Sequence, residues 1–193
     1  MVGLKAEISA KTEGGYFYDM QNVRKFKHIK DDPYSITELE TGYVLLGWYQ
    51  RFKGYTVFTC KQHGPELHHL EPGFRAKHLM EMSIVAEAVC NLFKPDKLNY
   101  ELLGNGCPHI HWHLYPRIKG DTPIISSVYQ LPNNALFDEA TRPGDKLRED
   151  MTASIKTEIE RLLTKQGCPN FGHSNFICKK GGYNDEAEKI PAE

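Results

Sequence analysis

Residues 105–117 read Asn-Gly-Cys-Pro-His-Ile-His-Trp-His-Leu-Tyr-Pro-Arg, and the alternation inside this run constrains the fold more than any other feature. Successive side chains of a β-strand point to opposite faces, so His109, His111 and His113 would share one face. The intervening apolar residues would enter a core on the other face (Ile110, Trp112, Leu114). A helix would spread the same residues around its circumference, so the alternation predicts a strand over 109–115.

Three interpretations of the histidine triplet compete. The first is a histidine-rich strand without a function, although three imidazoles on one face carry a cost of desolvation and mutual repulsion. The second is a metal site, because neutral imidazole binds zinc. Neighbouring same-face positions of a strand lie about 7 Å apart, which disfavours three consecutive ligands on one ion, but a His-X-His pair could chelate with a third ligand from elsewhere. The third is nucleophilic catalysis by one imidazole that its neighbours orient.

With these residues in view, the run from His109 to Tyr115 resembles the signature of the histidine-triad hydrolases and transferases, His-apolar-His-apolar-His-apolar-apolar. The following Pro116-Arg117 is also usual in that family. Further segments resemble a short-loop bacterial branch of it, and the likeness covers about residues 31–120. These segments are Gly54–Phe58, Lys61–His63, Glu66–Leu70, Leu98–Asn105 and Pro108.

The remaining pattern predicts an α+β fold. Tyr43–Trp48 and Tyr55–Cys60 have the composition of a strand hairpin, and Asn99–Leu103 and His109–Tyr115 form a second strand pair. Between the pairs, apolar residues recur every three or four positions from Leu79 to Phe93, which predicts a helix that begins after Glu71 and ends before Pro95. With a further short strand ahead of the first hairpin, we expect a HIT-like, five-stranded antiparallel meander sheet with a helix packed on one face.

The character of the chain changes after Gly120. Prolines and asparagines punctuate a linker-like stretch, and a second apolar stripe runs from Leu147 to Leu163. We therefore expect a HIT-like domain over residues 1–120 with its signature-bearing core at 31–120. A linker and amphipathic helix over 121–167 would form a C-terminal helical extension, and 168–193 would be a polar tail.

Composition limits the partners and the compartment. The 24 basic residues nearly balance the 25 acidic ones, so no long nucleic acid is expected as a partner. The apolar stretches are too short to span a membrane, and no signal peptide opens the chain. The five cysteines are odd in number and form no Cys-X-X-Cys pair, which favours a reduced, cytoplasmic protein. Cys107 beside the triplet is interpreted as a small filler of a tight loop.

The resemblance implies attack at the α-phosphate of a nucleotide. It assigns the nucleophile to the middle histidine, here His111, and the intermediate is a nucleotidyl-histidine. A neutral imidazole suits this role because its pKa of about 6.5 leaves it largely unprotonated at neutral pH. His109 would orient the nucleophile through its backbone carbonyl, and His113 would hydrogen-bond a phosphate oxygen or the bridging oxygen.

Substrate binding is expected around the loop that precedes the triplet. The amides near Gly106 could cradle a phosphate, and the Asn105 side chain could donate to it or could serve only as a turn residue. Asn99 is a second polar candidate. Two positions depart from the family pattern. Tyr55 stands where many relatives carry a fourth histidine and would hydrogen-bond the phosphate side or simply pack. Gly47-Trp48 replaces the usual ribose-binding residue, and Trp48 could stack on a base.

The sequence therefore predicts a nucleotide hydrolase that acts on a dinucleoside polyphosphate or a related nucleoside phosphate derivative. A nucleotidyl transferase or phosphorylase on the same fold and a non-catalytic nucleotide-binding protein are the alternatives. We expect no metal built into the protein, with Mg²⁺ accompanying a polyphosphate substrate as its counter-ion. An exposed sheet edge predicts a homodimer, to whose core or interface the C-terminal segment would add.

Overall fold

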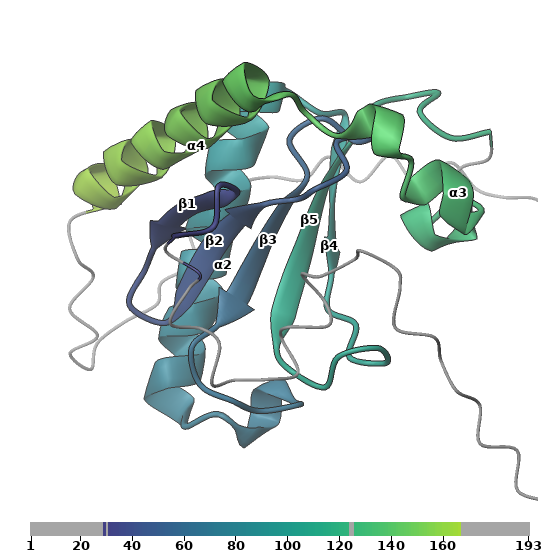
Figure 1. The fold of residues 1–193 in the computed structure, drawn as a ribbon. Helices are drawn as coiled ribbons and strands as arrows, with labels where there is room; N and C mark the ends of the chain where they lie inside the picture. Colours follow the sequence, from purple (N-terminus) through teal and green to yellow (C-terminus); the bar gives the residue numbers. More distant parts are fainter. Residues whose placement is uncertain (1–28, 30, 124–125, 167–193) are drawn as a thin grey trace, which may run out of the picture.

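The centre of the computed structural model is a five-stranded antiparallel sheet in the order β1-β2-β3-β5-β4 (Figure 1). The structure describes residues 29, 31–123 and 126–166. The strands are β1 (Ser35–Glu38), β2 (Gly42–Leu46), β3 (Thr56–Cys60), β4 (Lys97–Glu101) and β5 (His111–Arg117). Two long helices, α2 (Pro72–Phe93) and α4 (Asp145–Gln166), lie on one face of this sheet. The predicted α+β class is confirmed, and β1 is the expected short strand ahead of the hairpin.

In a simple meander β4 would lie beside β3 and β5 would form the edge, but here β5 lies beside β3 and β4 forms the edge. Helix α2 carries the chain from β3 to β4 at the edge, and β5 then returns to lie between β3 and β4. Burial explains this order. Nearly every residue of β5 is buried, whereas β4 exposes Lys97 and Tyr100. The strand that is apolar on one face and carries buried histidines on the other takes the central place, and the more polar strand forms the edge.

Strand β5 begins two residues later than the alternation predicts. Cys60 donates its N–H to the carbonyl of Ile110 at 2.9 Å, and Ile110 donates its own N–H to the carbonyl of Gly64 at 3.0 Å. Ile110 therefore pairs with the end of β3 and the loop after it, whereas the N–H of His109 donates to the carbonyl of Cys107 at 2.8 Å. At its other end the strand continues through Pro116, which lies opposite Leu98.

Helix α2 has clear signals at both ends. The Glu71 carboxylate accepts a hydrogen bond from the N–H of Phe74 at 2.9 Å, and Pro72 occupies the first turn. The helix ends at Phe93, and the capping residue Lys94, just before Pro95, has a left-handed φ of 47°. Its buried face is rotated from the predicted stripe, since Leu79 and Leu92 are exposed. The polar residues His78 and Glu81 are buried instead, because Thr41 and Trp112 hydrogen-bond to this face.

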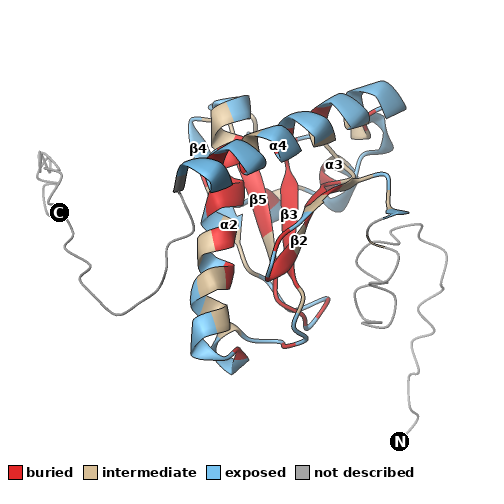
Figure 2. Cartoon of the chain, turned by 90° about the vertical axis from the view of Figure 1, so that its left-hand side faces the viewer, coloured by how far each residue is buried: buried red, intermediate tan, exposed pale blue. Residues whose placement is uncertain are grey.

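Helix α4 covers the same face of the sheet as α2 (Figure 2). It packs against α2, β1 and β2, and it buries Met151, Ile155, Ile159 and Leu162 in the main core. The predicted C-terminal helix thus adds to the core of its own chain. The linker-like stretch ahead of it contains three short helices, η3 (Val128–Gln130), α3 (Asn133–Leu136) and η4 (Glu139–Thr141).

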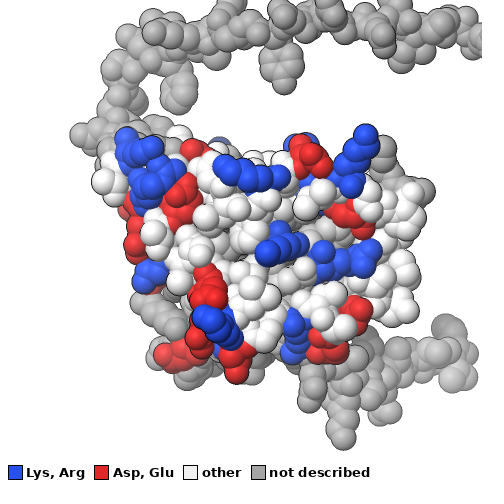
Figure 3. All heavy atoms as spheres, turned by 90° about the horizontal axis from the view of Figure 1, so that it is seen from above, with Lys and Arg blue, Asp and Glu red and all other residues white. Residues whose placement is uncertain are grey.

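The surface has no broad region of one charge on the face shown in Figure 3, where basic and acidic side chains are intermixed. Ion pairs along α4 include Arg148 with Asp145 at 2.6 Å and Lys146 with Asp150 at 3.3 Å. No helix in the described part of the chain is long and apolar enough to cross a membrane.

Candidate active site

The second and third histidines of the triplet lie side by side in the middle of the sheet. His111 and His113 share one face of β5, and each side chain is only 2% exposed. Their rings are 4.8 Å apart between centroids and nearly perpendicular. Trp112 and Leu114 point to the helix-covered face and join the main core. The predicted division of the strand into a histidine face and an apolar face is therefore confirmed for 111–114.

The tautomer of His111 follows from its hydrogen bond. Its Nδ1 lies 2.6 Å from the backbone carbonyl of His109, and a carbonyl only accepts, so Nδ1 carries the proton. The lone pair of the neutral ring is then on Nε2. Burial also lowers the pKa of His111 below its ordinary value of 6.5, which keeps the ring neutral at neutral pH.

His113 is oriented by Tyr55, a residue adjoining the start of β3. The Tyr55 hydroxyl lies 2.6 Å from His113 Nδ1, and their rings stack at 5.9 Å. Burial raises the pKa of Tyr55 far above its ordinary value, so the phenol stays protonated. Burial, with a contribution from His111, lowers the pKa of His113 to about 3. The neutral phenol and the neutral imidazole therefore share this hydrogen bond, in which the phenol donates when the imidazole proton is on Nε2 and accepts when it is on Nδ1.

His109 lies outside the strand and holds a different contact. Its Nε2 lies 2.7 Å from the carbonyl of Cys60 and donates to it. Its Nδ1 lies 3.3 Å from Nδ1 of His63, and the two rings stack at 5.5 Å. Two side-chain contacts thus fix His109, whose carbonyl orients His111. Local sequence does not single out His63 as this partner, because it is one of three histidines in the same loop region.

A cavity of about 350 Å³ opens beside the two strand histidines. Asn105, Gly106 and Cys107 line it from the loop that precedes the triplet. Cys107 is buried and its thiol pKa is raised, so it is not an activated thiolate, in agreement with a filler role. The remaining lining residues are Tyr55, Leu103, His111, His113, Tyr115, Tyr129 and Phe137.

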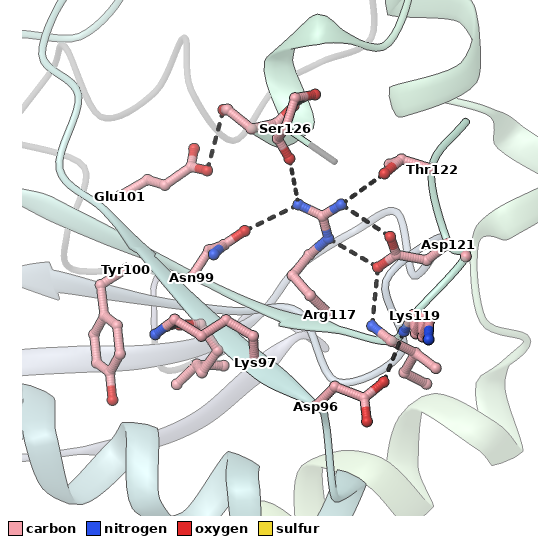
Figure 4. A pocket seen from close by; sticks show the side chains of 14 residues that line it. Asp96, Lys97, Asn99, Tyr100, Glu101, Arg117, Lys119, Asp121, Thr122 and Ser126 are labelled. Carbon is pink, nitrogen blue, oxygen red and sulfur yellow. Dashed lines mark hydrogen bonds and ion pairs between the residues drawn. The ribbon is translucent and has the colours of Figure 1, made fainter. Parts of the chain in front are cut away.

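Two expected substrate-binding residues do not reach this cavity. Asn99 lies on edge strand β4, and its side-chain oxygen accepts a hydrogen bond from Arg117 at 2.9 Å (Figure 4). Arg117 also forms an ion pair with Asp121 at 2.8 Å, so it ties β5 to the following turn. The Trp48 ring lies under the Arg142 guanidinium at 5.0 Å and does not line the cavity.

The two departures from the family pattern are physically linked. A Cβ added at Gly47 would overlap the ring of Tyr55. The Gly47 N–H also donates to the Tyr55 carbonyl at 2.8 Å. Glycine at 47 therefore makes room for the large ring of Tyr55.

Three aromatic residues of the cavity were not singled out by the sequence analysis. Tyr115 extends the period-two pattern of the triplet by one step, and its ring stacks on Tyr55 at 4.2 Å. The strand predicted over 109–115 already places residue 115 on the face of the three histidines, and this position was the signal for Tyr115. Tyr129 and Phe137 come from the linker-like stretch, where no local pattern points to the site.

No group of three or more histidine, cysteine, aspartate or glutamate side chains is arranged to hold a metal ion among the residues that the structure describes. A His-X-His pair of the triplet therefore has no third metal ligand of these types among residues 29, 31–123 and 126–166. The cysteines in this part, Cys60, Cys90 and Cys107, are free thiols.

Comparison with known proteins agrees with this geometry. Residues 36–120 match the model of the HIT domain family, whereas no curated protein matches the chain significantly. A histidine triad protein from Marinobacter aquaeolei is 22% identical, with a TM-score of 0.59 over 70% of this chain and 95% of its own. One from Bradyrhizobium japonicum is 22% identical, with a TM-score of 0.58 over 68% and 94%. A hypothetical histidine triad nucleotide-binding protein from Sulfolobus tokodaii is 22% identical, with a TM-score of 0.53 over 72% and 91%. These structures share the fold of this chain.

Proposed function

Because the chain belongs to the HIT family through residues 36–120, we propose that it is a nucleotide hydrolase that attacks the α-phosphate through His111. The substrate is a dinucleoside polyphosphate or a related nucleoside phosphate derivative. The observation that carries the proposal is the 2.6 Å contact between His111 Nδ1 and the His109 carbonyl. It makes Nε2 the nucleophilic atom at neutral pH.

The reaction divides into two displacements. In the first, the bond from His111 Nε2 to phosphorus forms while the bond from phosphorus to the leaving oxygen breaks, and that oxygen takes its proton from solvent. In the second, water attacks phosphorus, the bond to Nε2 breaks, and a nucleoside monophosphate leaves with a neutral imidazole behind it. The proton of water passes to solvent. Each step is easier than direct attack by water, since imidazole is the better nucleophile.

His113 and the loop before the triplet supply hydrogen bonds to the phosphate. In this proposal the Tyr55 phenol donates to Nδ1 of His113, and the Nε2–H of His113 donates to a phosphate oxygen or to the bridging oxygen. The Asn105 side chain and the amide of Gly106 lie on the same cavity and are placed to donate to the non-bridging oxygens. We propose no resident metal, with Mg²⁺ accompanying a polyphosphate substrate. The absence of a resident metal would be supported if the protein hydrolyses a monophosphate ester without added Mg²⁺ and if a chelator leaves this activity unchanged.

The decisive experiment compares wild type with His111→Ala. Turnover should fall at least about a thousandfold if the covalent route is essential. The exposed His69 provides the matched control, since His69→Ala removes the same side chain outside the cavity. An acid-labile nucleotidyl adduct should be trapped on wild type and absent from His111→Ala. Near-normal turnover in this variant would refute the mechanism.

The same experiment separates the alternative functions. A transferase or phosphorylase would use phosphate instead of water on the same adduct, so products are analysed in buffers with and without phosphate. A non-catalytic binding protein would bind nucleotide but form no adduct. We further propose that the protein acts in the cytoplasm, where free thiols such as Cys60 and Cys107 persist.

A further inference from the structure

Two large aromatic side chains are exposed at the mouth of the histidine cavity. Tyr129 is 42% exposed and Phe137 is 45% exposed, and both line the cavity with His111 and His113. Both lie beyond residue 120, where the match to the HIT domain ends. This wall of the cavity is therefore contributed by the C-terminal extension.

The neighbours of these aromatics anchor the extension to the sheet. Val128 is fully buried and Leu136 nearly so, and both join a core cluster with Leu45 and Val57 of the central strands. Each buried aliphatic residue is followed directly by one of the exposed aromatics. The backbone that carries Tyr129 and Phe137 is thus held by core packing while the rings remain accessible.

Further contacts fix the direction of both rings. The Tyr129 ring lies edge-on to His113 at 6.4 Å, and its hydroxyl lies 3.5 Å from that of Tyr115. The Phe137 ring lies edge-on to Tyr49 at 5.7 Å. Both pairs are T-shaped, in which the edge of one ring meets the face of the other, and the exposed part of each aromatic ring is available to a flat ligand.

The chemistry of the cavity indicates what this wall binds. None of its lining residues, all within the described part of the chain, is lysine or arginine, so it offers no ion pair to a chain of phosphates. Its volume of about 350 Å³ is at the small end of ligand pockets, which run from about 300 to 1,000 Å³. An apolar, aromatic wall next to a phosphate-binding centre suits one flat, uncharged ring system.

We propose that Tyr129 and Phe137 form a nucleobase subsite, which seats the base attached to the phosphate that His111 attacks. This inference rests on the proposed function and adds the part of the substrate that the extension recognises. The subsite accommodates one nucleoside, and any second nucleoside of a dinucleotide lies outside the cavity.

The test measures binding of adenosine 5′-monophosphate and of ribose 5-phosphate by calorimetry. The two ligands share the phosphate and sugar, so their affinity ratio reports the base alone. Phe137→Leu and Tyr129→Leu should lower affinity for the adenosine nucleotide about five- to a hundredfold, the usual range for loss of a base stacking partner. Affinity for ribose 5-phosphate should not change. Tyr129→Phe keeps the ring and should bind like wild type.

Tyr100→Leu is the matched control. Tyr100 is 46% exposed and does not line the cavity, and it lies opposite Leu114, whose side chain is on the helix-covered face. Leucine preserves apolar volume at each position, and a thermal melt verifies folding. Equal binding of the two ligands by wild type, or a parallel loss of both in the variants, would overturn the subsite.

The outcomes also separate this inference from the hydrolase mechanism. If wild type forms the nucleotidyl adduct but the variants keep the wild-type affinity ratio, the subsite is wrong and the mechanism stands. If no adduct forms but the ratio collapses in Phe137→Leu, the subsite stands and the mechanism is wrong.

Discussion

The hydroxyl of Tyr55 lies 2.6 Å from Nδ1 of His113, and this hydrogen bond fixes the orientation of the His113 ring. The phenol is buried and its pKa is strongly raised, so it does not ionise. A protonated phenol can donate through its O–H or accept through its oxygen, so it can pair with either neutral tautomer of His113. Tyr55 therefore orients the His113 ring in both tautomers.

Tyr55→Phe should lower kcat about ten- to a hundredfold, by analogy with the loss of a group that orients a metal-bound imidazole. The stacking of ring 55 on Tyr115 would remain, so the fold should persist. Steady-state kinetics and a thermal melt measure the two effects. An unchanged kcat would show that the hydroxyl only fills space, which is the packing role that the sequence left open.

Gly47→Ala should disturb the same histidine indirectly. The new methyl group would overlap the Tyr55 ring, which is backed by Tyr115 and has little room to move. We expect a loss of about 1–3 kcal/mol in the free energy of unfolding, as for other overpacked sites, together with reduced kcat. Gly144→Ala is the control, because a Cβ there meets no atom within 4 Å. Denaturant titration measures the free energy of unfolding of both variants. Equal values for Gly47→Ala and Gly144→Ala would contradict the steric coupling between position 47 and the Tyr55 ring.

A buried polar chain behind the site predicts how stability depends on pH. Trp112 donates to His78 Nε2 at 3.2 Å, and His78 Nδ1 lies 3.1 Å from the Thr41 hydroxyl, which donates to Glu81. Burial lowers the pKa of His78 to about 4. The unfolded chain therefore takes up a proton near pH 6.5 that the folded chain refuses until about pH 4, and stability falls as pH drops through this window.

His78→Asn should weaken that dependence, while His69→Asn, at an exposed position, should not. Buried His109, His111 and His113 also have lowered pKa values, so part of the slope should survive in the His78 variant. Melting temperatures between pH 4 and pH 7 provide the measurement. Identical slopes in wild type and His78→Asn would rule out this role for His78.

Local pattern was sufficient for some of these features and insufficient for others. Period-two alternation predicted that His111 and His113 share a face, because strand geometry alone determines it. It could not predict that β5 lies between β3 and β4, since strand order depends on which faces are buried by distant segments. Nor could it place Asn99, which is adjacent in sequence to the site but bonds to Arg117 at the sheet edge.

Local sequence pattern also could not predict that Phe137 lies at the cavity. Its stretch has the composition of a linker, and only the burial of Leu136 among residues of the central strands brings it to the cavity. Such long-range packing joins segments that are about ninety residues apart in the sequence, as the ring contact between Tyr49 and Phe137 does.

The free edge of the sheet predicts assembly. Strand β4 pairs only with β5 within the described residues, and α4 packs beside β1 at the opposite edge. An unpaired edge invites addition of a further strand, so we expect a homodimer in which two β4 strands pair around a twofold axis. Helix α4 serves its own core, so Ile159→Ala should cost about 2–5 kcal/mol of stability without changing the association constant. Sedimentation at low micromolar concentration measures the mass of both proteins, and a single species of 22.1 kDa for wild type would exclude the dimer.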